Sequence, residues 1–281
     1  MKIYHSAFTL SENYIHLLEG KKVYILRSFY GSKKTDCPLY CNGVFLDSGA
    51  FSALRSGVDI DLNVYIDFLK EHSSAFDVYA NLDVIGNAKA TLINQKKMDA
   101  VGLTPIPTFH YGENFKYLEL YIKNYPYIAL GGMVPLQRGP ALSTWLDVCW
   151  KKIGKAKIKV HGFGLTDLEL MQSYPWYSVD STTASRAGRI GVLITPWGQL
   201  RVSTGIKEKA ESTIHTPLKI IKVLNWVKEF TPNLVSSWEQ ISAPTKEASQ
   251  LRIIINALYI ESEAAKTIER KNLRVTGFFD K

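Results

Sequence analysis

Short apolar runs and amphipathic segments alternate along most of the chain. Runs such as residues 44–46 and 127–130 have the length and composition of buried strands. Between such runs lie segments such as residues 61–72 and 115–125, in which apolar side chains recur at helical spacing. This alternation is typical of a parallel sheet covered by helices. Six or seven repeats of the unit in one domain predict an α/β protein built on an irregular (β/α)8 TIM-type barrel.

The same pattern sets the expected elements. We expect strands near residues 23–26, 44–47, 77–83, 105–110, 127–132, 158–164 and 177–180, and a strand pair within residues 189–204. We expect helices near residues 11–18, 61–72, 88–101, 115–125, 142–153, 167–174 and 246–272, and one that begins at Thr216-Pro217. The chain would then divide into a barrel over residues 1–215 and a helical extension over residues 216–281 that packs on the barrel.

Three of the expected strands lead into an aspartate: Asp47, Asp83 and Asp180. The carboxyl ends of barrel strands lie at one mouth, so we expect the three carboxylates to converge there. Taken alone, Asp180 has another interpretation, as a helix N-cap or turn residue, because Ser-Thr-Thr follows it. Convergence of three carboxylates instead predicts an active site in which Asp180 is the nucleophile.

Glycine and aromatic residues follow other expected strands. Residues 131–132 and 162–164 contain glycines, which let the backbone approach a flat ligand closely. Phe51 or Phe163 could stack on such a ligand. Asp83 can accept two hydrogen bonds side by side, and the Watson–Crick edge of guanine offers N1–H and N2–H in that geometry. The mouth of the barrel therefore suits a purine base.

The charge balance favours an anionic partner. The 281 residues carry a formal net charge of +8, and lysines crowd residues 151–159 and 21–34. Such a surface favours nucleic acid, although a charge run is also typical of a solvated face. No apolar run approaches the length of a membrane span, and residues 1–5 lack the apolar core of a signal peptide. We therefore expect a cytoplasmic protein with no membrane partner.

The cysteines indicate neither disulfides nor a metal. Cys37, Cys41 and Cys149 are too few and too scattered for a disulfide framework. Cys37 and Cys41 would make half of a zinc site, but no second Cys or His pair lies nearby to complete it. We expect free thiols, no metal site and no organic cofactor.

The candidate residues resemble, in order along the chain, the motifs of the tRNA-guanine transglycosylase superfamily. Residues 47–51, Asp-Ser-Gly-Ala-Phe, are similar to its Asp-Ser-Gly-Gly-Phe-Gln signature. Leu82-Asp83 is similar to the start of its Phe-Asp-Glu-Cys segment, although the Glu and Cys are absent. Residues 130–133 resemble its Gly-Gly-Leu turn, and residues 162–164 resemble its Gly-Val-Gly turn.

The last matching motif carries the nucleophile of the family. Asp180, followed by Arg186, has the spacing of that nucleophile and its arginine, so the resemblance covers about residues 40 to 190. It implies an irregular (β/α)8 barrel and a double displacement. Asp180 would attack C1′ of a guanosine nucleotide and expel guanine, and a 7-deazaguanine base such as 7-cyano-7-deazaguanine would then displace Asp180. Asp47 would be the general acid and base.

The resemblance also implies a base-binding pocket. Asp83 would read the N1/N2 edge of the base, and Phe51 would stack on its ring. His110 lies near a position that the family usually fills with Gln, so a base contact and an ordinary strand-end histidine stay open as alternatives. The implied pocket comprises Asp83, Phe51, Ser48, Gly49, His110, Gly131, Gly132, Met133, Gly162 and Phe163.

One difference from the family concerns the polymer substrate. The tRNA enzymes carry a Cys-x-Cys-x-x-Cys zinc site with a distant His after the nucleophile, whereas this chain has no cysteine after Cys149. The chain therefore most resembles the zinc-less branch that places 7-deazaguanines in DNA, in bacterial modification systems and in phages that mask their genomes. A target base in duplex DNA would have to be flipped out of the stack, or met single-stranded. The expected phosphate contacts are Arg186, Arg189, Arg201, Lys152, Lys155 and Lys157.

Three alternatives stay open. The chain could be a tRNA enzyme that lacks zinc, a catalytically silent nucleic-acid-binding subunit of the same fold, or a glycosidase that acts on free nucleosides. The presence of Asp47, Asp83 and Asp180 together argues against the silent subunit, and the basic charge argues against a nucleoside substrate. The sequence indicates neither the 7-deazaguanine derivative nor the oligomeric state.

Overall fold

The computed structural model describes the chain except residue 19 and residues 135–139, 204–215 and 267–281. Two compact units make up the described chain. The first contains Met1–Ser6, Val23–Ser181 and Lys266, and the second contains Ala7–Lys22 and Thr182–Ala265. The domain boundary expected after residue 215 falls at the edge of a range outside the described residues and stays a prediction, as does packing of the C-terminal helices on the barrel.

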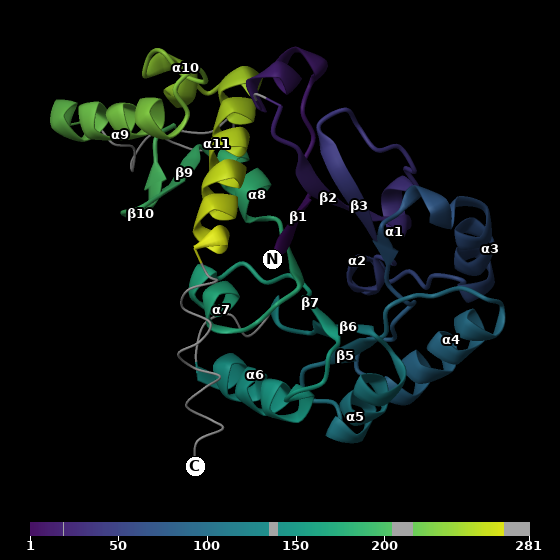
Figure 1. Cartoon of the computed structure of the whole chain (residues 1–281). Coiled ribbons are helices and arrows are strands. Elements are labelled where there is room, and N and C mark those ends of the chain that lie inside the picture. Colours follow the sequence, from purple (N-terminus) through teal and green to yellow (C-terminus); the bar gives the residue numbers. More distant parts are fainter. Residues whose placement is uncertain (19, 135–139, 204–215, 267–281) are drawn as a thin grey trace. The chain divides into compact units, whose positions relative to one another are not determined.

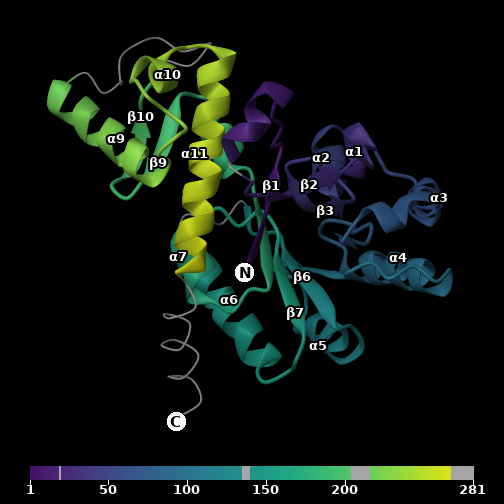
Figure 2. The same cartoon turned by 45° about the horizontal axis from the view of Figure 1, so that its top comes forward.

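The first unit contains a parallel sheet with helices outside it. The strands are β1 (Lys2–Ser6), β2 (Val23–Ser28), β3 (Cys41–Asp47), β4 (Val78–Tyr79), β5 (Thr108–His110), β6 (Tyr127–Gly131), β7 (Lys159–Gly162) and β8 (Ser178–Ser181). The helices are α1 (Phe29–Ser32), α2 (Ala50–Arg55), α3 (Leu62–His72), α4 (Ala88–Ala100), α5 (Phe115–Asn124), α6 (Pro140–Ile153) and α7 (Leu168–Ser173), with the short 3-10 helix η2 (Ser73–Ala75). Helices α3 to α6 lie on the outer side of the sheet (Figures 1 and 2).

The sheet is curled but does not close. Its eight strands follow the order β4-β3-β2-β1-β8-β7-β6-β5, and each pair is parallel. An isolated parallel bridge between Ala80 and Ile106 joins the two edges at one point, without a continuous ladder between β4 and β5. The expected α/β class and barrel-like parallel sheet are thus confirmed, whereas the expected closed barrel is not.

Strand β1 occupies the centre of the sheet and was missed by the sequence pattern. It pairs with β2 on one side and with β8 on the other, so that Tyr4 lies opposite Tyr24 and Asp180. The pattern gave no signal because Lys2, His5 and Ser6 interrupt a run of five residues. Its burial depends on residues distant in sequence, and local propensity does not report that.

The curled sheet encloses an aromatic and aliphatic core. Tyr4, Phe45, Ala80, Ile106 and Ala129 come from five different parts of the sheet and form one buried cluster. Tyr4 packs edge-on against Phe45, with ring centroids 5.3 Å apart. Because side chains alternate along each strand, residues two apart face this same interior, and the last residue of a strand lies at the rim.

Four helices of this unit, α3, α4, α5 and α7, begin after a residue whose side chain caps them. Asp61 accepts hydrogen bonds from the backbone N–H groups of Asn63 and Val64 at the start of α3. Asn87, Asn114 and Asp167 likewise accept from backbone N–H groups at the starts of α4, α5 and α7. Such caps satisfy donors that the first helical turn leaves unpaired. The expected helices over these residues are confirmed.

The second unit is built around one long helix. Its elements are η1 (Glu12–Leu18), α8 (Thr183–Arg189), β9 (Val192–Thr195), β10 (Gly198–Arg201), α9 (Pro217–Phe230), α10 (Glu239–Ser242) and α11 (Lys246–Ala265), with β9 and β10 antiparallel. A Cβ on Gly188 would lie 2.5 Å from Cγ1 of Ile253, which shows how closely α8 and α11 pack. The buried Asn256 accepts from the backbone N–H of Ile194 and donates to the carbonyl oxygen of Val192. This amide links α11 to β9.

Two further observations concern the chain as a whole. Cys37, Cys41 and Cys149 are free thiols, as expected. Among the described helices, none combines the length and the apolar character that a bilayer crossing requires. The part of the helix expected over residues 267–272 lies outside the described residues.

Candidate functional site

Three aspartates lie at or just beyond the carboxyl ends of strands in the first unit. Asp47 is the last residue of β3, Asp180 lies in β8, and Asp83 follows β4. The charges of Asp83 and Asp180 both act on Asp47 strongly enough to raise its pKa. The expected convergence of the three carboxylates is therefore present in the structure.

Asp47 has the most perturbed acidity of the three. Burial is the largest cause that raises its pKa, and the neighbouring charges of Asp83 and Asp180 raise it further. Hydrogen bonds from the backbone N–H groups of Gly49 and Ser48 oppose the rise, and the pKa is raised to about 8. A carboxyl group with this pKa is mostly protonated at pH 7. It can therefore both donate and accept a proton near neutral pH, as a general acid and base must.

Asp180 is held by hydrogen bonds on both oxygens. The backbone N–H of Gly164 donates to Oδ1 at 2.7 Å, and the hydroxyl of Ser6 donates to Oδ2 at 3.2 Å. Only 7% of the residue is exposed. Thr182, rather than Asp180, occupies the N-cap position of α8. The alternative interpretation of Asp180 as the cap of that helix is therefore wrong.

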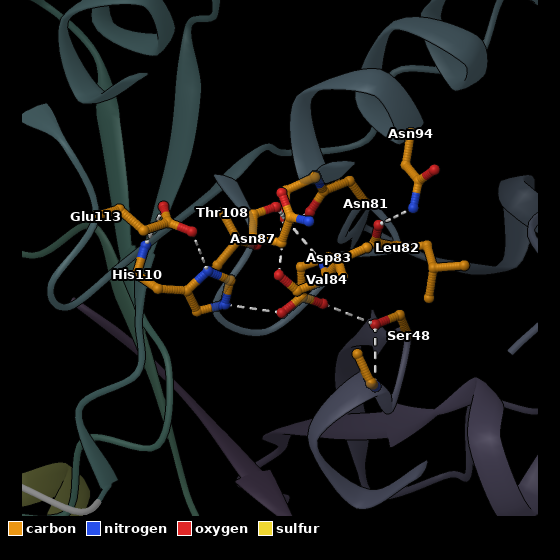
Figure 3. Close-up of polar contacts among 12 residues, drawn as sticks. Ser48, Asn81, Leu82, Asp83, Val84, Asn87, Asn94, Thr108, His110 and Glu113 are labelled. Carbon is orange, nitrogen blue, oxygen red and sulfur yellow. Dashed lines mark hydrogen bonds and ion pairs between the residues drawn. The ribbon is translucent and has the colours of Figure 1, made fainter. Parts of the chain in front are cut away.

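Asp83 belongs to a chain of polar contacts at the same rim (Figure 3). Its Oδ1 accepts from the hydroxyl of Ser48 at 3.1 Å, and its Oδ2 lies 2.8 Å from Nε2 of His110. Nδ1 of His110 lies 3.3 Å from Oε1 of Glu113. Burial lowers the pKa of His110, but the hydrogen bonds and charges of Asp83 and Glu113 outweigh it and raise the pKa to about 9. At pH 7 the ring is an imidazolium that donates to both carboxylates.

The loop that carries Asp83 is fixed by side-chain bonds to its backbone. Asn94 donates to the carbonyl oxygen of Leu82 at 2.9 Å (Figure 3). The hydroxyl of Thr91 accepts from the N–H of Val84, also at 2.9 Å. Both side chains come from α4, which begins directly after this loop. Helix α4 therefore sets the position of Asp83, although the two are several residues apart.

Two expected pocket glycines lie beside His110. A Cβ on Gly131 would lie 3.0 Å from Cδ2 of the His110 ring, and Gly132 has a φ of 73°, which favours glycine. Met133, the third expected residue of this turn, is fully buried. The turn thus lets the His110 ring lie against β6, and its contact with a base stays a prediction.

The other expected pocket residues differ in their surroundings. A Cβ on Gly162 would lie 3.1 Å from the ring of Trp176, so this glycine makes room for an indole. Phe163 packs against the ring of Phe45, with centroids 5.4 Å apart. Phe51, at the start of α2, is 43% exposed and is therefore available to a ligand.

The glycine before α2 has a steric role. Gly49 has a φ of 80°, and a Cβ there would lie 2.4 Å from Oγ of Ser28. The neighbouring Ser48 is fully buried. The Asp-Ser-Gly sequence thus forms a tight turn that presents Asp47 and Ser48 to the site.

The expected phosphate-binding cations divide between the two units. Lys152, Lys155 and Lys157 lie on the first unit, and Lys152 forms an ion pair with Glu119. The arginines lie on the second unit. Arg186 is exposed there, while Arg189 and Arg201 donate to the backbone carbonyl oxygens of Ala7 and Ile190, respectively. Their contacts with nucleic acid stay predictions.

Three polar residues of the site were not expected from the sequence. Glu113 lies three residues after His110, a spacing that could have suggested an ion pair. His161, which directly precedes the expected Gly162 turn, lies 3.4 Å from Oδ1 of Asp180. Ser6 could not have been found, because it lies at the end of the unrecognised strand β1.

Among the described residues, no three His, Cys, Asp or Glu side chains are grouped so that they could hold a metal ion.

Comparison with known proteins gives no further assignment. No protein-family model matches the chain, and no curated protein matches it at a significant level.

Proposed function

We propose that the protein is a DNA-guanine transglycosylase, which exchanges guanine in DNA for a 7-deazaguanine base through a covalent intermediate on Asp180. The observation that carries the proposal is that the charge of Asp180 acts on Asp47, a carboxyl group that is mostly protonated at pH 7. Base exchange needs both a nucleophilic carboxylate and a group that gives a proton to the leaving base and takes one from the incoming base. We take the curled sheet to be the irregular barrel of the tRNA-guanine transglycosylase superfamily, which the motifs resemble.

In the first half of the reaction, an oxygen of Asp180 attacks C1′ of the target nucleotide. The C1′–N9 bond breaks, its electron pair stays with guanine, and Asp47 gives its proton to the departing base. The hydrogen bonds from Gly164 and Ser6 orient Asp180 for this attack. Guanine then leaves the pocket, and the deoxyribose stays joined to Asp180.

In the second half, N9 of the incoming 7-deazaguanine attacks C1′. The ester bond to Asp180 breaks, the carboxylate leaves with the electron pair, and Asp47 takes the proton from N9. Asp47 is then protonated again, as it was at the start of the reaction. A pKa of about 8 suits this double role, because the proton can move in either direction near neutral pH.

Base recognition is assigned to Asp83. Each of its oxygens accepts one hydrogen bond within the protein, from Ser48 and from His110, and each keeps a second lone pair for the N1–H and N2–H donors of the base. The imidazolium of His110 donates a charge-assisted hydrogen bond to Oδ2 of Asp83 and fixes the plane of the carboxylate. His110 would thus act through Asp83 as well as through any direct contact with the base.

DNA is proposed as the polymer because of the basic charge and because no cysteine after Cys149 could supply the zinc site of the tRNA enzymes. The test is transfer of labelled guanine or 7-cyano-7-deazaguanine into duplex DNA, single-stranded DNA and tRNA, compared side by side. We expect label in DNA with the natural chain and none with Asp180→Ala. Asp59→Asn, which changes an exposed carboxylate, serves as the control.

Each outcome of this test has a distinct meaning. Label in tRNA alone would replace DNA with tRNA as the substrate. Label in none of the three polymers, with nucleic-acid binding intact, would indicate the silent binding subunit. Full exchange by Asp180→Ala would remove Asp180 from the mechanism.

A further inference from the structure

A buried histidine lies beside the proposed nucleophile. Nε2 of His161 is 3.4 Å from Oδ1 of Asp180, and His161 is fully buried. At this distance the contact is long for a hydrogen bond, and Nε2 has no hydrogen-bond partner within the described residues. A buried polar atom without a partner is costly, so its position next to the reacting carboxylate calls for an explanation.

The ring of His161 cannot turn away from Asp180. It packs against the rings of Phe45 and Phe163, with centroids 4.5 Å and 4.6 Å away, and Tyr4 lies 6.2 Å away. These contacts come from β3, from the turn that follows β7 and from β1, all in the same unit. The direction of Nε2 toward the carboxylate is therefore fixed by the core.

The other ring nitrogen ends a chain of hydroxyl groups. Nδ1 of His161 lies 2.6 Å from Oγ of Ser178, which in turn lies 2.6 Å from the hydroxyl of Tyr127. Burial raises the pKa of Tyr127 far above its ordinary value, so the phenol keeps its proton and can donate to Ser178. When the phenol donates, Ser178 donates to Nδ1, and this arrangement places the proton of the neutral imidazole on Nε2.

The charge of Asp180 selects the same tautomer. The opposite arrangement would direct the Nε2 lone pair at the carboxylate, which is repulsive in a site that excludes water. Burial lowers the pKa of His161 against the opposing influence of Asp180, so the ring is neutral at pH 7. Both arguments place a neutral N–H next to Oδ1.

We infer that His161 is a positioning residue for Asp180, and that its Nε2–H eases departure of the Asp180 carboxylate from the glycosyl-enzyme. This inference rests on the proposed function. A donor beside the carboxylate stabilises the free anion most, the transition states less and the neutral ester least. Loss of the donor therefore slows breakdown of the ester and does not slow its formation, so the covalent intermediate accumulates.

The kinetic test follows the two half-reactions separately. Labelled guanine-containing DNA is mixed with the enzyme, quenched in denaturant, and the covalent adduct is measured by gel retardation. 7-Cyano-7-deazaguanine is then added, and the decay of the adduct is followed. We expect His161→Phe to slow this decay about tenfold, because the N–H dipole that faces the departing carboxylate is lost, without slowing adduct formation.

A second pair of variants keeps His161 in place in case His161→Phe does not fold. Tyr127→Phe removes the donor at the head of the hydroxyl chain, so Ser178 can accept from Nδ1–H and part of the population changes tautomer. We expect a slower decay by a few-fold. Tyr121→Phe is the matched control, because it removes a buried hydroxyl that has no hydrogen-bond partner within the described residues. That control should leave both half-reactions unchanged.

Nitrogen-15 spectra of the histidine rings give a readout that does not depend on activity. We expect His161 to carry its proton on Nε2 in the natural chain, and Tyr127→Phe to shift part of the signal toward the other tautomer. A proton on Nδ1, or equal decay of the natural and His161→Phe adducts, would overturn the inference. If the natural chain forms no adduct with any nucleic acid, the proposed function itself fails, and this role of His161 fails with it.

Discussion

The raised pKa of Asp47 makes a prediction about stability that does not depend on the proposed reaction. The pKa of this carboxyl group is about 8 in the folded protein and about 3.9 in an unfolded chain. The folded state thus holds the proton more tightly. The stability that this tighter proton binding contributes is complete below pH 4. It is lost as the pH rises from about 4 to about 8, because the carboxyl group ionises in the unfolded state before it ionises in the folded state. Asp47→Asn removes this loss.

The size of the effect follows from the two pKa values. A pH of 7 is about three units above the pKa of the unfolded carboxyl group. At about 1.4 kcal/mol per unit, ionisation in the unfolded state lowers the free energy of unfolding by at most about 4 kcal/mol. Asp47 keeps some exposure, so water relieves part of the cost. We therefore compare the free energy of unfolding of Asp47→Asn with that of the natural chain. The difference should favour the variant by about 1 to 2 kcal/mol more at pH 7 than at pH 4.

Urea denaturation of both proteins from pH 4 to pH 9 measures this difference. The change between pH 4 and pH 8 is the informative quantity, because packing differences between Asp and Asn contribute equally at every pH. Asp59→Asn, at an exposed position, should show no such change. A stability difference for Asp47→Asn that stays constant with pH, or that shrinks toward pH 8, would refute the raised pKa.

Three further predictions concern other contacts. His110→Gln removes a cation whose pKa is raised to about 9. The stability that this cation contributes is complete below about pH 6.5 and is lost as the pH rises through 9. Urea denaturation should therefore show that the variant loses about 1 to 3 kcal/mol of unfolding free energy at pH 6 and less at pH 9.5. Gly49→Ala should lower the melting temperature more than Gly57→Ala does, because both glycines have positive φ but only the first would bring a Cβ against other atoms. Equal losses would mean that Ser28 moves aside. Asn256→Leu should destabilise the second unit by about 2 to 4 kcal/mol, measured by thermal unfolding, because it leaves the N–H of Ile194 buried without its acceptor.

Much of the candidate site follows from the sequence because strand ends are local features. A short apolar run that ends in Asp47 or Asp180 predicts where those side chains emerge, and the parallel topology brings them together. Asp83 was found for the same reason, although β4 covers only Val78–Tyr79. Two residues that contact Asp180 were not predicted from the sequence. His161 and Ser6 become part of the site only through strand pairing, which no local pattern reports.

The protonation of the site was also beyond the sequence. The charged state of His110 depends on its lying between Asp83 and Glu113, one of which comes from another strand end. The acidity of Asp47 depends on burial and on two carboxylates far away in the chain. Both are properties of the assembled rim, so residue types alone could suggest the chemistry and not its pH range.

The central place of β1 has a consequence for how the chain folds during synthesis. Of the strands in this sheet, β1 is made first and β8 last, and the hydrogen bond between Ser6 and Asp180 joins residues 174 positions apart. One edge of β1 therefore waits unpaired until nearly the whole unit has been made, which is the slow, aggregation-exposed situation of long-range parallel pairing. The last pairing to form is also the one that places Ser6 beside Asp180, so a chain stalled before β8 exposes an unpaired strand edge and lacks the residue that we propose as the nucleophile.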